Sequence, residues 1–472
     1  MAKIHSLMDM GRRGMMLSQT ALNTTSHNIA NKSTEGYSRQ RVDIVTNPAI
    51  DEGRYRAGTG AMLGGINRVN NPWLEKQIEQ EGSQQSFLES KAGALAGLEN
   101  VINEQTTDGI NASISKFFNS FRDLANNPES AVPRTQVREA ATGLIGVLQS
   151  AKKQIDSAAV GVSKSIDAGL DEVNNHAQEI AKLNDKILNV EISGGQANDE
   201  RDRRDLLVKK LSEKMNISYA EDPKTGMINV TAGKTAVLVA GSSATRLYKV
   251  DSEFEGPRVM YDLSKGGTAF DVTDQFTGGA VGASVEVAGP SGAIGQLTQH
   301  LEDMAYNIAN EVNKVHQEGY DRYNAAGVQF FDMSRPEEFS IETMNLNKDI
   351  LKDVGLIAAS SQPNSPGDNN VAQVLQNLQF QKVMGDGQYT FDNFYNSKVG
   401  EIGLMTKGVN TSLESQKNTL DQLKNTRESI SGVNLDEEAS KMIEFQKSFE
   451  ASARMIRVAD EMFDTILNLK RM

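Results

Sequence analysis

The 472-residue sequence contains no cysteine and only 10 prolines. The absence of thiols excludes disulfides, zinc–thiolate sites, iron–sulfur clusters and cysteine nucleophiles. Aromatic residues make up 6% of the chain, which is too few for large aromatic pockets. Because prolines and aromatics are both scarce, the composition favours long helices with thin aliphatic cores over compact β-sandwiches.

The sequence also lacks a long apolar run and a concentrated charge of one sign. No stretch approaches 18 consecutive apolar residues, so no transmembrane helix is predicted. The net charge is −13, and the basic residues form no long stripe. We therefore expect neither a nucleic-acid partner nor membrane insertion.

Apolar residues recur every seven positions at both ends of the chain. The N-terminal row is Met8, Met15, Leu22 and Ile29. The C-terminal row is Leu435, Met442, Phe449, Ile456 and Phe463. A narrow apolar row with this spacing is typical of a coiled-coil helix. The two rows therefore predict terminal helices that associate with a partner helix.

The middle of the chain predicts a helical domain with an insertion. Heptad spacing within 71–215 resumes in 291–430, whereas 216–290 is rich in Gly, Thr and Val with tight turns. We predict three domains: 1–70 with 431–472, 71–215 with 291–430 including some β and loop segments, and a β-rich insert at 216–290. Because insertions of this kind tolerate excision, we expect the helices to remain folded without the insert.

Local motifs give no support for catalysis. The Gly233-Lys-Thr sequence lacks the first glycine of a phosphate-binding loop, and the five histidines lack metal-ligand spacing. The charge run from Asp199 to Asp205 could suggest acid–base chemistry, but ion pairs at a helix start explain it better. No residue is therefore predicted as catalytic, cofactor-binding or metal-binding.

Two stretches resemble the axial proteins of the bacterial flagellum, the family of rod, hook and hook-associated proteins. The C-terminal stretch begins at Gly432 and ends near Leu467, and the N-terminal stretch runs from Ser26 to Gln40. The motif residues in the N-terminal stretch are Asn28, Ala30, Asn31, Thr34, Gly36 and Tyr37. The Ser-Arg-Gln that follows Tyr37, together with internal segments at 195–207, 238–241 and 366–369, is similar to the hook-associated protein 1 branch.

The resemblance implies a nested, elongated and mainly α architecture. In such proteins the terminal helices pair as a coiled coil, a helical bundle domain surrounds them and a β domain lies outermost. The implied protein is secreted by type III export and located at the hook–filament junction, where it serves motility. It joins hook to filament by self-assembly through its terminal helices, with no enzyme activity and no cofactor.

The resemblance also implies partners. These are further copies of the chain, the flagellar hook protein, a second junction protein (hook-associated protein 3) and a cytoplasmic export chaperone. The C-terminal row is the candidate chaperone-binding site. Two alternatives stay open: another axial component of the rod or hook, and an enzyme or adhesin carried on an axial scaffold.

Overall fold

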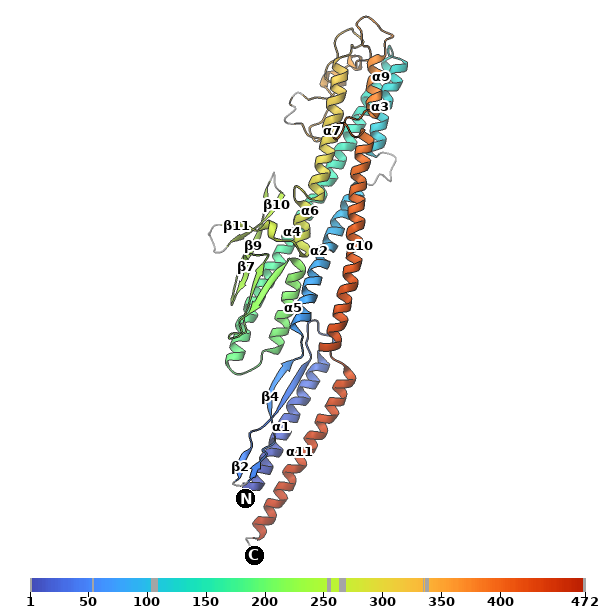
Figure 1. The fold of residues 1–472 in the computed structure, drawn as a ribbon. Helices are drawn as coiled ribbons and strands as arrows, with labels where there is room; N and C mark the ends of the chain where they lie inside the picture. The colour runs from blue at the N-terminus through green and yellow to red at the C-terminus, as the bar shows by residue number, and fades with distance from the viewer. Residues whose placement is uncertain are drawn as a thin grey trace.

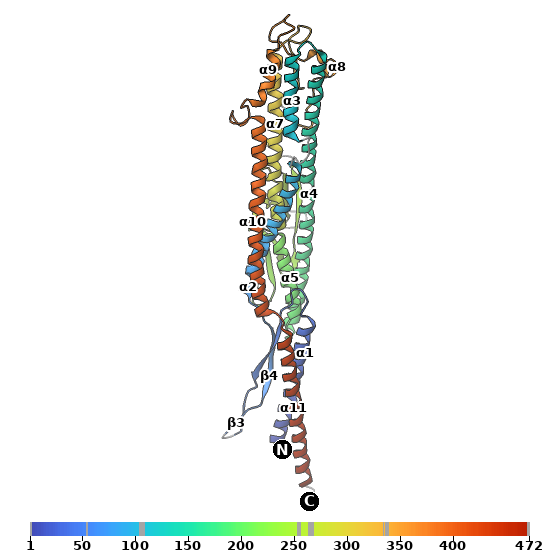
Figure 2. The ribbon, with the colours of Figure 1, turned by 90° about the vertical axis from the view of Figure 1, so that its right-hand side faces the viewer.

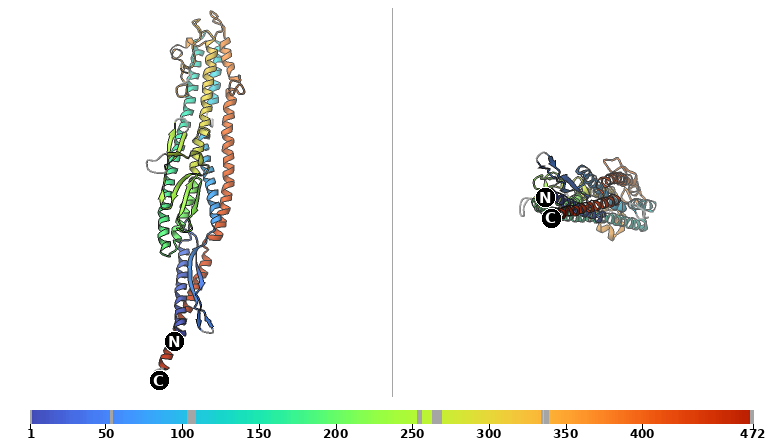
Figure 3. Two further views of the ribbon diagram at one scale, coloured as in Figure 1. Left: turned by 60° about the vertical axis from the view of Figure 1, so that its left-hand side comes forward. Right: turned by 90° about the horizontal axis from the view of Figure 1, so that it is seen from below.

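The computed structural model of the chain is a long rod with both termini at one end (Figures 1 and 2). It describes residues 2–52, 55–102, 109–252, 256–262, 269–333, 335 and 339–469. Helices run along the rod, and the strands of the middle segment lie on one side of it (Figure 1). Seen from below in Figure 3, the terminal helices lie in front of the body. This mainly α fold with a β-rich insert confirms the predicted fold class.

The lower part of the rod contains both ends of the chain. Helices α1 (Ala2–Ala30) and α11 (Leu435–Leu469) run antiparallel, side by side. Strands β1 (Gln40–Thr46) and β4 (Ala61–Arg68) form an antiparallel ribbon against α1, extended by the hairpin of β2 (Ile50–Glu52) and β3 (Tyr55–Ala57). Helix α1 ends before a turn that includes Gly36, whose φ of 80° is in the left-handed region that glycine tolerates.

The body is built from nine further helices within the described residues. They are α2 (Pro72–Ile102), α3 (Ile110–Asn126), α4 (Ala131–Ile192), α5 (Asn198–Lys214), α6 (Gly279–Ala288), α7 (Ala293–Gln317), α8 (Lys348–Lys352), α9 (Asn370–Asn377) and α10 (Phe391–Ser431). Helix α4 has 62 residues, which at 1.5 Å per residue gives a length of about 90 Å. None of the described helices is both long and apolar enough to cross a membrane.

Two small antiparallel sheets make up the β-rich segment. The four-stranded sheet follows chain order and contains β5 (Ile217–Glu221), β6 (Ile228–Ala232), β7 (Ala236–Ala240) and β8 (Ser243–Ala244). The three-stranded sheet has the order β11-β10-β9 and contains β9 (Arg246–Ser252), β10 (Gly256–Asp262) and β11 (Ala269–Asp271).

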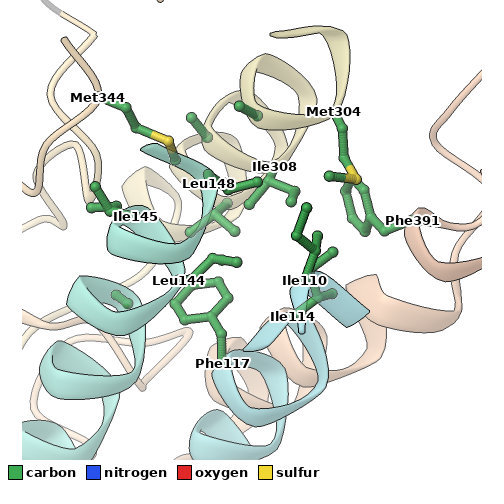
Figure 4. Packing of buried hydrophobic residues seen from close by; sticks show 14 of the residues in the cluster. Ile110, Ile114, Phe117, Leu144, Ile145, Leu148, Met304, Ile308, Met344 and Phe391 are labelled. Atoms are coloured by element: carbon green, nitrogen blue, oxygen red, sulfur yellow. The ribbon is translucent and has the colours of Figure 1, made fainter. Parts of the chain in front are cut away.

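The upper hydrophobic core lies among α3, the first half of α4, α7, α9 and the start of α10. Figure 4 shows Phe117 of α3, Leu144 of α4 and Ile308 of α7 converging on it. All three side chains are fully buried. The core also contains Phe330 and Phe331, which lie in the long connection after α7. Residues from distant parts of the chain thus close the upper end of the rod.

The second core joins the β segment, which the sequence predicts to be separable, to the helices of the lower body. Side chains of the strands pack directly on the second half of α4, where Ile166, Val173 and Ile180 are fully buried among them. Two buried asparagines of α4 bond to strand backbones: Asn174 donates to the Leu247 carbonyl at 2.8 Å, and Asn184 donates to the Ile228 carbonyl at 2.8 Å. The strands therefore share one core with α4, α5 and α6.

We predict that deleting residues 219–290 unfolds the lower half of the body. The deletion removes the apolar cover of α4 and leaves Asn174 and Asn184 without their backbone partners, and a buried unsatisfied polar group costs about 1–3 kcal/mol. Hydrogen exchange should show loss of protection in 166–187 and in α5. Residues 137–155, which pack in the upper core, are the internal control. Retained protection in 166–187 would show that the insert is separable.

Candidate assembly site

Small side chains allow α1 and α11 to approach closely. A Cβ atom on Gly11 would lie 2.7 Å from Cγ1 of Ile456, and one on Gly14 would lie 2.6 Å from Oγ of Ser452. Both distances are shorter than real Cβ contacts, so a side chain at either position would force Ile456 or Ser452 to shift. Ala21 of α1 and Ala459 of α11 are each 1% exposed. Small residues therefore allow the two helices to pack closely along this line.

The structure places the predicted heptad rows at the edges of this contact. Met8, Met15, Leu22 and Ile29 are half-buried. The fully buried heptad of α1 is the neighbouring row of Ile4, Gly11, Ser18 and Thr25. On α11, Met442, Phe449, Ile456 and Phe463 are half-buried, whereas Leu435 is exposed. The ring of Phe463 lies 5.7 Å from that of His5, so this row contacts α1 at the tip of the pair.

A buried polar network joins α1, β1 and α11 at the other end of the pair. The Asn28 side chain, 1% exposed, donates to Oε2 of Glu438 and to the Gln40 carbonyl, both at 2.9 Å. Its Oδ1 accepts from the Gln40 amide at 2.9 Å and from the Tyr37 hydroxyl at 2.8 Å. Both N–H donors and both lone pairs of the amide oxygen are thus satisfied. We call Asn28, Tyr37, Gln40 and Glu438 the polar lock.

The charge state of the lock follows from its surroundings. Burial raises the pKa of the Tyr37 hydroxyl well above its usual value, and the nearby carboxylates of Asp199, Asp202 and Glu438 act in the same direction. The hydroxyl is therefore a permanent donor to Asn28. Glu438, 1% exposed, is balanced by Arg39, whose Nε lies 3.1 Å from Oε1.

The other motif residues shape the turn after α1. The Asn31 side chain donates to the His27 carbonyl at 3.1 Å, and the Thr34 hydroxyl donates to Asn31 at 3.1 Å. A Cβ on Gly36 would lie 3.0 Å from Cβ of Leu206, so the turn packs tightly on α5. Ala30 is exposed at the end of α1. The motif therefore combines a buried network with a turn that docks on the body.

Sequence reasoning missed the attachment of this terminal segment to α5. Asp199, Asp202 and Asp205 follow each other at intervals of three, which places them on one face of the helix. Asp199 accepts from the Gln40 side chain, and Asp202 accepts from the Ser38 amide at 2.9 Å. One nitrogen of Arg68 lies 2.8 Å from Asp202 and from Asp205. The acidic run therefore binds the terminal segment to the body.

A second apolar row on α11 is exposed. It consists of Met455, Val458, Met462 and Ile466, which are between 37% and 47% exposed. At 100° per residue this row lies on one side of the buried Ser452–Ala459 line, and the row of Phe449, Ile456 and Phe463 lies on the other. Leu7 of α1 joins Met455 and Val458 in a groove of about 450 Å³. Within the described ranges, no group of three or more acidic or histidine side chains is arranged to hold a metal ion.

We predict that Asn28→Asp separates the terminal helices at their upper end. The substitution replaces a donor to Glu438 by a second carboxylate at hydrogen-bond distance, and placing two buried carboxylates against each other should cost at least about 2 kcal/mol. Thermal unfolding followed by circular dichroism at 222 nm should show an earlier loss of part of the helix signal. Asn23→Asp, on an exposed face of α1, is the matched control. Equal unfolding curves for the two variants would contradict a role for the lock.

Three family models match the chain. "Flagellar hook-associated protein FlgK helical domain" matches residues 95–331, which is half of the chain. "Flagella basal body rod protein" matches 8–37, and "Flagellar basal body rod FlgEFG protein C-terminal" matches 426–469. The last two coincide with α1 and α11, and the first covers most of the body.

Relatives match over nearly the full length. Flagellar hook-associated protein 1 of Bacillus subtilis is 26% identical over 98% of this chain and 97% of its own length. Flagellar hook-associated protein 1 of Escherichia coli is 24% identical over 98% and 100%. The solved structure of the flagellar hook junction protein FlgK from Burkholderia pseudomallei superposes with a TM-score of 0.67 at 15% identity, covering 75% of this chain and all of the other. The chain belongs to the family of flagellar hook-associated protein 1, axial components of the bacterial flagellum at the hook–filament junction.

Proposed function

We propose that the chain is a non-enzymatic structural link between hook and filament that assembles through its terminal helices. The observation that carries this proposal is the exposed apolar row beside an already closed helix pair. One side of α11 is covered by α1, yet Met455, Val458 and Met462 are still exposed on another. A row of this kind on an isolated molecule is an unsatisfied interface.

The occupant that we propose for the row is a second copy of the chain. Burial of a fully exposed apolar side chain contributes about 1.5–3 kcal/mol, and the row and Leu7, which are 37–47% exposed, supply the corresponding part of this at the contact. Lys447, Glu450 and Arg454 line the same groove. The groove therefore presents both positive and negative side chains to the same helix of a neighbouring copy. A contact between two different surfaces of neighbouring copies generates a ring where the rotation closes and a helical array where it does not.

We predict that Val458→Asp with Met462→Asp abolishes assembly without unfolding the body. Two carboxylates in the row would have to be desolvated at the contact, which is strongly unfavourable. In a deletion strain complemented with this variant, electron microscopy should show hooks without filaments.

The matched control is Ile443→Asp. Ile443 is 60% exposed and lies about 22 Å before Val458 along α11, outside the groove, so the same chemical change should leave filaments attached. Filaments on cells that carry the double variant would exclude the row as an assembly surface. Missing hooks in the deletion strain itself would favour a rod or hook component over a junction component.

We further propose that the row of Met442, Phe449, Ile456 and Phe463 binds the cytoplasmic export chaperone before assembly. This row is half-buried against α1 in the folded chain, so the chaperone and α1 would use the same surface in turn. An amphipathic helix that docks through residues seven apart fits a groove or helix on a partner. The hook protein and hook-associated protein 3 are the proposed neighbours after export.

We predict that Phe449→Asp with Phe463→Asp abolishes chaperone binding while the middle of the chain stays folded. The change removes two aromatic anchors and introduces charge into the contact. Isothermal titration of the purified chaperone measures the effect, and Val458→Asp with Met462→Asp is the control for the other row. If the variant with Phe449→Asp and Phe463→Asp bound the chaperone with the affinity of the unchanged chain, the chaperone site would lie elsewhere.

A further inference from the structure

A charged cavity lies at the base of the body, where the terminal segment meets it. Its volume is about 510 Å³, and it is bounded by α2, α5, β5, the end of α10, the end of β4 and the turn after α1. These elements belong to both the body and the terminal segment.

One carboxyl in this cavity is buried without a cationic partner. Glu79 of α2 is 8% exposed, and its Oε1 accepts a hydrogen bond of 3.2 Å from the hydroxyl of Tyr219 on β5. Ser212 of α5 donates to its main-chain carbonyl at 3.4 Å. Among the residues that the structure describes, no Lys or Arg nitrogen forms an ion pair with the Glu79 carboxyl. Glu79 therefore connects α2 with β5 through a single side-chain bond.

The acidic groups that line the cavity oppose ionisation of Glu79. Glu75 lies one turn before it on α2, Asp205 projects from α5 and Glu221 from β5. Glu428 of α10 and Glu35 of the turn after α1 also line the cavity. Carboxylates that share a confined space raise the free energy of each further negative charge.

The arginines of the cavity are already engaged. Arg68 pairs with Asp202 and Asp205. Arg427 pairs with Glu75 at 3.0 Å and with Glu428 at 2.9 Å. Neither of these two arginines is thus left to pair with Glu79.

The lysines that face the cavity come from three elements. Lys209 projects from α5, Lys424 from α10 and Lys32 from the turn after α1. Lys76, a neighbour of Glu79 on α2, favours the ionised carboxyl. Burial is the largest effect and raises the pKa of Glu79 to about 7, with Asp205 and Glu75 adding to it, while the Tyr219 hydrogen bond and Lys76 oppose it.

We propose that Glu79 is a proton-operated latch at the joint between α2 and β5 within the body. In its neutral form the carboxyl stays buried in this joint, bonded to Tyr219. In its ionised form a negative charge enters a cavity that already contains several carboxylates, and the joint loosens.

The sign of the pH effect follows from linkage. A carboxyl whose pKa is raised on closure stabilises the closed joint at low pH. This stabilisation is lost as the pH rises from 4.5, the ordinary pKa of a glutamate, to about 7, the raised pKa of Glu79. It changes little above that pH. The expected loss of protection against hydrogen exchange at the joint, corrected for intrinsic exchange, is on the order of tenfold or more between pH 5 and pH 8.

The test is hydrogen exchange of the full chain at pH 5, 6, 7 and 8, read at residues 72–83 and 205–221. Glu79→Gln should keep the joint protected at every pH, because its amide cannot ionise. Tyr219→Phe should shift the loss of protection to higher pH, because the lost hydrogen bond favours the ionised form. Ser212→Ala is the control, since Ser212 contacts only the backbone of Glu79, and it should keep the pH profile of the unchanged chain.

Two results would overturn the latch. One is protection at the joint that does not change between pH 5 and pH 8 in the unchanged chain. The other is a pH profile that persists in Glu79→Gln. If that variant fails to fold, Tyr219→Phe decides: an unshifted profile rejects the latch, and a shifted one supports it.

Discussion

One buried amide holds the two ends of this chain together. Asn28 is hydrogen-bonded to β1 and to Glu438 of α11, and removal of any partner would leave a polar group buried without compensation. Because the close contact of α1 and α11 below it relies on glycine, serine and alanine, hydrophobic burial alone specifies the register of the two helices weakly. The polar lock favours one register, and the position of the exposed row on α11 relative to α1 depends on it.

The heptad rows predicted both terminal helices and their association with a partner helix, because periodicity is a local property of the sequence. The same reasoning could not find the fully buried line, because Gly11, Ser18 and Ala459 contribute almost nothing to an apolar pattern. The acidic run from Asp199 to Asp205 was read as ordinary helix-start ion pairs, since its partners Ser38, Gln40 and Arg68 lie more than 130 residues earlier in the chain. Spacing along the sequence cannot show such partners.

The β-rich segment illustrates another limit of predicting structure from local composition. Its composition separates it from the helices on either side, and the fold class is as predicted. Its strands nevertheless bury their apolar face on Ile166, Val173 and Ile180 of α4. A change in composition along the sequence predicts a change in secondary structure. It does not predict which faces of distant elements pack together in one core.

The uninterrupted course of α4 has a mechanical consequence. This helix passes through both hydrophobic cores of the body, with Leu144 and Leu148 in the upper one and Ile166 and Val173 in the lower one. A sharp bend of the body between the two cores requires breaking backbone hydrogen bonds of a continuous helix, whereas a loop at that place would bend freely. The body should therefore resist bending as a single beam.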